Sequence, residues 1–245
     1  MRQKPIHPAL QPYLEGQVIL LDKPLHWTSF DAIRKIRRLT GVNKVGHAGT
    51  LDPLATGLLI ICTGKFTKRI NEYMAQRKVY TGTITIGAST PTYDLESEPE
   101  NFKDYSFVDD SLLQEKRSSF VGEIQQVPPI HSAIKQGGKP VYLAARKGDD
   151  VKLEPRPVTI YSFGLTCVEM PRIDFEVACS TGTYIRSLAN DYGAALGTGG
   201  YLSQLRRTQI GDFNVADAMT VESFEAHIAQ LKQDWEEKNP STVGK

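Results

Sequence analysis

The residues best suited to acid–base chemistry lie in one glycine-rich stretch, residues 44–57, which reads KVGHAGTLDPLATG. Asp52 is its carboxylate, and His47 stands five positions earlier. Three glycines and a proline in fourteen residues predict a loop whose backbone can approach a ligand closely. A carboxylate in such a loop can serve as a general base or as a nucleophile. A simpler interpretation stays open, in which Asp52 before Pro53 only caps a turn.

Basic residues flank this loop on both sides, although the whole chain has a net charge of only +1. Residues 32–78 contain ten Lys or Arg and two acids, Asp52 and Glu72. Such a concentration is typical of a surface that binds a polyanion, but it could also be an ordinary solvated face. A carboxylate among phosphate-binding bases would repel the phosphates. That conflict favours a chemical role for Asp52.

The sequence lacks the motifs of several enzyme classes. It contains no phosphate-binding P-loop, no dinucleotide-binding fingerprint, no G-x-S-x-G and no zinc signature. The five histidines have no metal-ligand spacing. The three cysteines, Cys62, Cys167 and Cys179, form no C-x-x-C pair and are expected to be reduced. If the protein is an enzyme, the sequence therefore predicts that it uses side chains alone, with no cofactor and no metal.

Hydrophobic patterning predicts a mixture of strands and helices. Strands are expected at residues 18–21, 58–62, 79–86, 158–168 and 173–179, and a further strand runs through residue 205. Helices are expected at residues 28–41, from about residue 65, at 111–120, at 183–196 and from about residue 220. The first helix is expected to turn Phe30, Ile33 and Ile36 to one face. This arrangement predicts an α+β protein with a mainly antiparallel sheet.

The chain is expected to form one catalytic domain over residues 17–238. Residues 1–16 contain three prolines and little periodicity, so an arm outside the core is expected there, and residues 239–245 are expected to be a polar tail. The N-terminus has no apolar stretch of the kind found in signal peptides, and no apolar run approaches membrane-spanning length. We therefore expect a cytoplasmic protein without membrane association.

Several strings, in order along the chain, resemble the TruB-type tRNA pseudouridine synthases. They are LLDKP (20–24), WTSFDAIRKIRR (27–38), GHAGTLDPLATGLL (46–59), KVYTGTITIG (78–87), TPTYD (90–94), VPPIHSAIK (127–135), CSTGTYIRSLA (179–189) and YLSQLRRTQIGDF (201–213). The resemblance implies the pseudouridine-synthase fold, a mixed and mainly antiparallel sheet flanked by helices with a central active-site cleft. It implies isomerisation of one uridine in the T-loop of tRNA, at position 55, to pseudouridine.

The resemblance also implies roles for particular residues. Asp52 corresponds to the catalytic carboxylate, and Arg186 to the arginine that pairs with it. Asp94 corresponds to an acid in the same network, and Tyr80 to the tyrosine that lies against the target base. Without the resemblance, Tyr80 would be interpreted as a core aromatic and Arg186 as part of a surface ion pair.

Other matches concern the RNA and the support of the loop. His47 corresponds to a residue near the extruded nucleotides, and Leu205 to an apolar residue under the flipped base. Lys23 and Pro24 correspond to a motif that packs beneath the active-site loop. The remaining candidates are expected to contact phosphates from the second basic helix: Lys65, Lys68 and Arg69.

One departure from the family and two alternatives remain. Many members continue into a C-terminal PUA domain, whereas the 32 residues after Phe213 leave no room for one, so a short form is expected. It would hold the tRNA T-arm as a monomer with no obligate protein partner. The alternatives are an RNA-binding or tRNA-folding module without catalysis, and a pseudouridine synthase that acts on other RNA.

Overall fold

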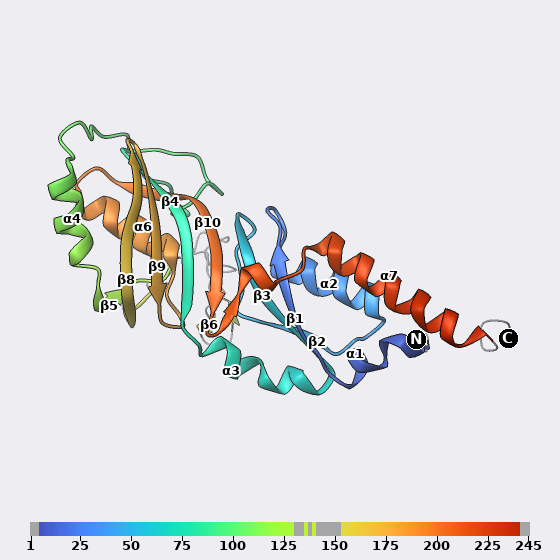
Figure 1. The fold of residues 1–245 in the computed structure, drawn as a ribbon. Helices are drawn as coiled ribbons and strands as arrows, with labels where there is room; N and C mark the ends of the chain where they lie inside the picture. The colour runs from blue at the N-terminus through green and yellow to red at the C-terminus, as the bar shows by residue number, and fades with distance from the viewer. Residues whose placement is uncertain (1–4, 130–134, 137–138, 141–152, 241–245) are drawn as a thin grey trace. The chain divides into compact units, whose positions relative to one another are not determined.

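Residues 1–76 and 206–245, far apart in sequence, form the first of two compact units, and residues 77–205 form the second (Figure 1). This computed structural model describes residues 5–129, 135–136, 139–140 and 153–240. The sequence predicts one catalytic domain over residues 17–238 and does not predict this division. Residues 1–4, residues 130–134 of the VPPIHSAIK string and residues 241–245 of the expected tail lie outside the described residues.

The first unit is built on antiparallel strands. β1 (Val18–Lys23) and β2 (Val45–Ala48) both pair with β3 (Ala55–Thr63), and the end of β10 (Gly200–Ile210) pairs with the short β11 (Phe213–Asn214). The helical segments of this unit are η1 (Pro8–Leu10), α1 (Gln11–Glu15), α2 (Ser29–Thr40), η2 (Gly64–Arg69), α3 (Ile70–Met74), η3 (Val215–Asp217) and α7 (Val221–Lys238).

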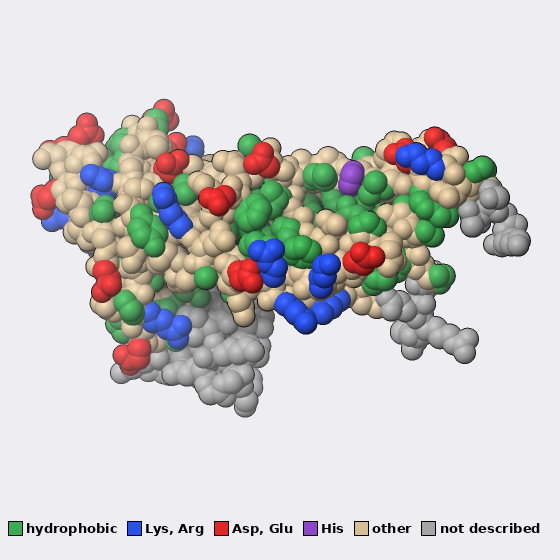
Figure 2. Space-filling model, turned by 60° about the horizontal axis from the view of Figure 1, so that its bottom comes forward, with side chains coloured by type: hydrophobic (Ala, Val, Ile, Leu, Met, Phe, Trp, Pro, Cys, Tyr) green, Lys and Arg blue, Asp and Glu red, His purple; other side chains and the backbone are tan. Residues whose placement is uncertain are grey.

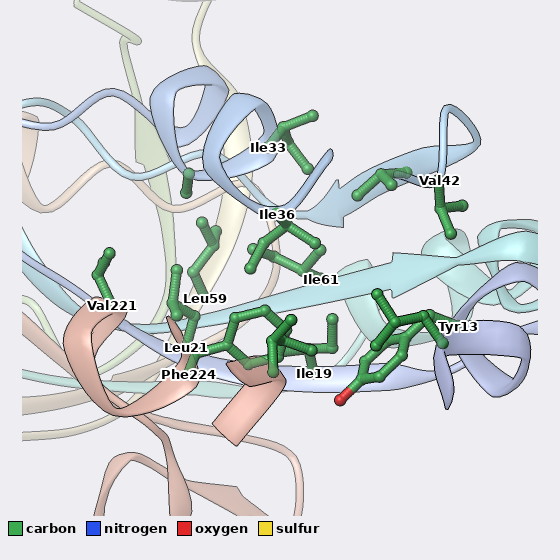
Figure 3. Close-up of a cluster of buried hydrophobic side chains, with 14 residues drawn as sticks. Tyr13, Ile19, Leu21, Ile33, Ile36, Val42, Leu59, Ile61, Val221 and Phe224 are labelled. Atoms are coloured by element: carbon green, nitrogen blue, oxygen red, sulfur yellow. The ribbon is translucent and has the colours of Figure 1, made fainter. Parts of the chain in front are cut away.

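The core of this unit lies where α2 and α7 meet the strands. Figure 3 shows Ile33 and Ile36 of α2, Leu59 of β3 and Phe224 of α7 in one cluster of buried side chains. Tyr13 of α1 belongs to the same cluster and is 8% exposed. The expectation that residues 1–16 lie outside the core is therefore wrong for Leu10 and Tyr13, whose side chains are buried, whereas Leu14 is 40% exposed.

Helix α2 begins with a capping box. The Thr28 side chain accepts from the backbone of Asp31, and the Asp31 side chain accepts from the backbone of Thr28. This start turns Ser29 toward the interior and leaves Phe30 58% exposed, with the Arg34 guanidinium 5.6 Å from its ring centre. Phe30 is expected on one face with Ile33 and Ile36, but it is exposed while those two residues are buried.

The second unit contains a longer antiparallel run of strands. In the order β4, β9, β8, β5, the strands are β4 (Lys78–Ile86), β9 (Arg172–Cys179), β8 (Arg156–Glu169) and β5 (Gly122–Gln126). The start of β10 lies on the other side of β4, and β6 (Lys135–Gln136) pairs separately with β7 (Lys139–Pro140). Helices α4 (Asp110–Ser118) and α6 (Ile185–Ala195) complete the unit. The expected α+β class with a mainly antiparallel sheet is confirmed.

Three predicted boundaries need correction. The expected loop at residues 44–57 is a strand at both ends, so only residues 49–54 connect β2 to β3. The expected second basic helix is a 3₁₀ segment, η2, followed by the five-residue α3. The strand expected to end at residue 205 continues to residue 210.

Candidate active site

Asp52 lies in the connection between β2 and β3, and the residues on both sides of it are held by hydrogen bonds. The Ser29 hydroxyl accepts from Leu51 N at 2.9 Å and donates to Leu51 O at 3.2 Å. The backbone N–H of His26 donates to Pro53 O at 2.8 Å. Ala55 N donates to the carbonyl of Asp52 itself at 3.0 Å. The half-buried carboxylate therefore stands on a fixed piece of backbone.

Two buried cations belong to the surroundings of this loop. Lys23 is fully buried and donates to Pro24 O at 3.0 Å and to Trp27 O at 2.6 Å. Burial lowers the pKa of Lys23 to about 8, and the negative charge of Asp52 acts in the opposite direction. Arg207, 1% exposed, donates to Leu58 O at 2.8 Å and to Gly49 O at 3.1 Å. The attraction between Lys23 and Asp52 favours the charged form of Lys23, since opposite charges stabilise each other.

Arg207 is a residue of this site that the sequence analysis does not single out. Its position in YLSQLRRTQIGDF offers no local signal, because its chain neighbours Arg206 and Thr208 are themselves polar and suggest a solvated stretch. The sequence cannot supply its partners, which are carbonyl groups of Gly49 and Leu58 about 150 residues away along the chain.

His47 is on β2, one strand position before Ala48 and close to the Asp52 loop in sequence. Burial lowers the pKa of its imidazole, and the positive charge of Arg207 lowers it further. The ring is therefore neutral at pH 7. Its Nδ1 atom is buried and has no hydrogen-bond partner among the described residues. The Gly49 backbone acts on the ring in the opposite direction and raises its pKa.

The second unit brings two of the candidate residues together. Arg186 lies in the first turn of α6, and its Nε atom is 3.6 Å from Oδ2 of Asp94, with both side chains about 5% exposed. Arg186 Nη1 also donates to Thr92 O at 3.3 Å. Asp94 is held in turn, because its Oδ1 atom accepts from Glu96 N at 3.0 Å and the neighbouring Tyr93 O accepts from Leu202 N at 2.9 Å. The result is a buried and oriented guanidinium.

Tyr80 and Leu205 also belong to the second unit. Tyr80 is on β4 opposite Val177 of β9 and is 8% exposed. Leu205, on β10, is half-buried. Asp52 belongs to the first unit, so the expected pair between Arg186 and Asp52 stays a prediction.

The candidate phosphate-binding residues are exposed. Lys65, Lys68 and Arg69 lie on η2, and Arg69 donates to Glu72 at 2.9 Å while it packs over the rings of Phe66 and Tyr73. Figure 2 turns the underside of Figure 1 forward and shows a group of Lys and Arg side chains beside an apolar patch. Among the residues that the structure describes, no cluster of three His, Cys, Asp or Glu could hold a metal ion. No helix in the described ranges is both long and apolar enough to cross a membrane.

Two family models cover most of the chain. Residues 37–185 match the N-terminal domain of the TruB family of pseudouridylate synthases, and residues 186–242 match the C-terminal domain of tRNA pseudouridylate synthase B. The chain belongs to the TruB family. It is 52% identical over 226 residues to the tRNA pseudouridine synthase B of Flavobacterium johnsoniae. The matched region covers 89% of this chain and 98% of that protein. The protein of the same name from Phocaeicola vulgatus is 47% identical, over 89% of this chain and 95% of that protein.

Solved structures agree with membership of the TruB family. A chain in the crystal structure of a Cbf5-Nop10-Gar1 complex is 28% identical with a TM-score of 0.73, over 93% of this chain. A chain in the structure of an H/ACA RNP bound to a substrate RNA containing 2'-deoxyuridine is 25% identical with a TM-score of 0.69, over 92% of this chain. This protein spans only 58% and 57% of those two chains. The expected pseudouridine-synthase fold is confirmed.

Proposed function

We propose that this protein is a tRNA pseudouridine synthase that isomerises one uridine of the T-loop. The observation that carries this proposal is the 52% identity to a protein named tRNA pseudouridine synthase B over 98% of that protein's length. The intact GHAGTLDP string with Asp52, set between fixed backbone contacts, supports it. The enzyme would work in the cytoplasm, where its tRNA substrate is found, as a monomer.

The reaction breaks the N1–C1′ bond of uridine and joins the uracil to C1′ through C5, so the C5 hydrogen leaves as a proton. Asp52 would be the catalytic carboxylate. It could attack the ribose or the ring, or it could remove a ribose proton to give a glycal intermediate. No electron transfer or group donor is needed, so side chains suffice for the chemistry.

The remaining roles follow the family resemblance. Arg186, held by Asp94, would correspond to the arginine that pairs with the catalytic carboxylate. Tyr80 would lie against the base and help remove the C5 proton. Leu205 would pack under the flipped uracil. His47 would lie near the nucleotides next to the flipped one.

Tritium release tests the reaction directly. The substrate is a tRNA transcript labelled with tritium at C5 of uridine, and a second transcript carries cytidine in place of the T-loop uridine. We expect the first transcript to release one equivalent of tritium per tRNA, and the second transcript to release none. Tight binding to the first transcript without any release would instead favour the RNA-binding module.

A guided or protein-assisted reaction on other RNA is the second candidate, because two solved relatives come from multi-component assemblies. Their identity of 25–28% is well below that of the relatives named for tRNA. Activity of the purified chain on free tRNA, with no added protein or guide, favours the tRNA enzyme. Activity that appears only with added components would favour the second candidate.

The exposed lysines of η2 should contribute to binding through phosphate charge. Replacing Lys65 and Lys68 by Ala should weaken tRNA binding. The plot of the logarithm of the binding constant against the logarithm of the salt concentration should become shallower by about 1.5, because each phosphate contact contributes ~0.7–0.9 to its slope. Filter binding over a range of KCl concentrations measures the slope. The matched control replaces two exposed lysines elsewhere, Lys103 and Lys238, by Ala. Equal slopes in both variants would remove η2 from the interface.

A further inference from the structure

We infer that Ser29 is a positioning residue for Asp52, an inference that rests on the proposed function of Asp52. One hydroxyl satisfies both backbone groups of Leu51, with 2.9 Å between Leu51 N and Oγ and 3.2 Å between Oγ and Leu51 O. A serine hydroxyl has one donor and two acceptor sites, so it can make both contacts at once. Ser29 is 2% exposed, so water does not compete for either contact.

The contact acts on Asp52 through the peptide group that joins it to Leu51. This group is planar and includes the carbonyl of Leu51 together with the nitrogen and Cα of Asp52. A hydrogen bond to that carbonyl therefore restrains the orientation of this plane, and with it the position of the Cα of Asp52. On the other side, the carbonyl of Asp52 accepts from Ala55 N at 3.0 Å. The Cα of Asp52 is thus held between two hydrogen-bonded planes, which sets the direction of its Cα–Cβ bond, from which the carboxylate extends.

Ser29 connects the Asp52 loop to a rigid element. It is the first residue of α2, between the capping-box residues Thr28 and Asp31, and α2 is packed into the core through Ile33 and Ile36. A catalytic group is placed accurately when its support belongs to a packed helix or strand. The contacts from His26 and Ala55 use backbone N–H groups, which nearly every residue type retains. Of these contacts, the Ser29 contact is the one that a side-chain substitution removes.

The test compares Ser29→Ala with Thr40→Val, a matched control in the same helix. Thr40 is 1% exposed, donates to Ile36 O at 2.8 Å and accepts from Val42 N at 3.3 Å, so it also joins a buried hydroxyl to the backbone. Both variants should lower the thermal midpoint by a few degrees. Tritium release gives kcat and KM, and filter binding gives the Kd for tRNA.

We expect kcat of Ser29→Ala to fall about 10–100-fold with KM and Kd within about threefold of wild type, since a misplacement of ~1 Å can cost about 100-fold. Thr40→Val should keep kcat within about threefold. Ser29→Cys should recover part of the loss, because a thiol is a weak donor and acceptor. Wild-type kcat in Ser29→Ala, or an equal loss of kcat in Thr40→Val, would overturn the inference.

Hydrogen exchange separates this inference from the proposed function. Ser29→Ala should speed amide exchange at Leu51 and Ala55, and Thr40→Val should not. If wild type released no tritium, the proposed function would fail, while the exchange data would still report on the contact. Unchanged exchange at Leu51 in Ser29→Ala would overturn the inference whatever the activity of the wild type.

Discussion

Replacing Asp52 by Asn should lower kcat for tritium release by about 1,000-fold or more while the protein still binds tRNA within about threefold of wild type. The amide keeps the size and shape of the side chain and the backbone contacts at Leu51 and Pro53, so the loop should stay in place. It removes the charge and the basicity that nucleophilic or general-base chemistry requires. Single-turnover rates with enzyme in excess separate this loss from any change in affinity.

The matched control for this substitution is Asp212→Asn. Asp212 is exposed and belongs to the same unit, so the variant also removes one negative charge but leaves the Asp52 loop unchanged. We expect its kcat to stay within about twofold of wild type. Asp52→Asn with more than about a tenth of wild-type activity, in a preparation free of wild-type enzyme, would contradict the role proposed for Asp52.

Replacing Gly57 by Ala should destabilise the fold by about 3 kcal/mol or more. Gly57 has φ of +104°, a conformation that L side chains rarely adopt, and an added Cβ would be 2.3 Å from Arg207 O and 2.8 Å from Arg207 N. Those atoms belong to the backbone of β10, so they cannot move away without breaking the sheet. Urea unfolding followed by circular dichroism and fluorescence measures the loss.

Gly122→Ala is the control that separates the two causes. Gly122 has a similar φ of +100°, but nothing lies within 4 Å of an added Cβ. Its cost should be about 1–2 kcal/mol, which is the strain of the backbone conformation alone. The additional loss of unfolding free energy in Gly57→Ala then measures the cost of crowding between β3 and β10. Equal losses in the two variants would show that the approach contributes nothing.

The sequence by itself determined the class of the fold and the main chemical candidate. Strands at β1, β3, β4, β8 and β9 and helices α2, α6 and α7 follow local hydrophobic periods, so their existence could be predicted. The start of α7 followed Thr220, whose side chain caps the helix by accepting from Ser223 N. Asp52 was found because glycines, a proline and flanking bases stand close to it in the sequence.

Local patterns failed where burial depends on distant partners. Phe30 has helical spacing with Ile33 and Ile36, yet the capping box turns Ser29 inward and leaves Phe30 exposed. The segment with Leu10 and Tyr13 has no hydrophobic periodicity, but these two side chains pack into a cluster with residues of α7 and β1. The 3₁₀ segment η2 replaced a predicted helix, since the capping and length that sustain an α-helix are absent there.

Only the tertiary structure decided how the candidate site is supported. Ser29 is 22 residues from Leu51, and Arg207 is about 150 residues from the carbonyl groups that it binds. No local rule relates such positions, because hydrogen bonds between them exist only after the strands have paired and α2 has packed. The sequence identified Asp52 as the candidate carboxylate. The folded chain determined what holds the backbone of its loop, because these contacts join residues that are distant in the sequence.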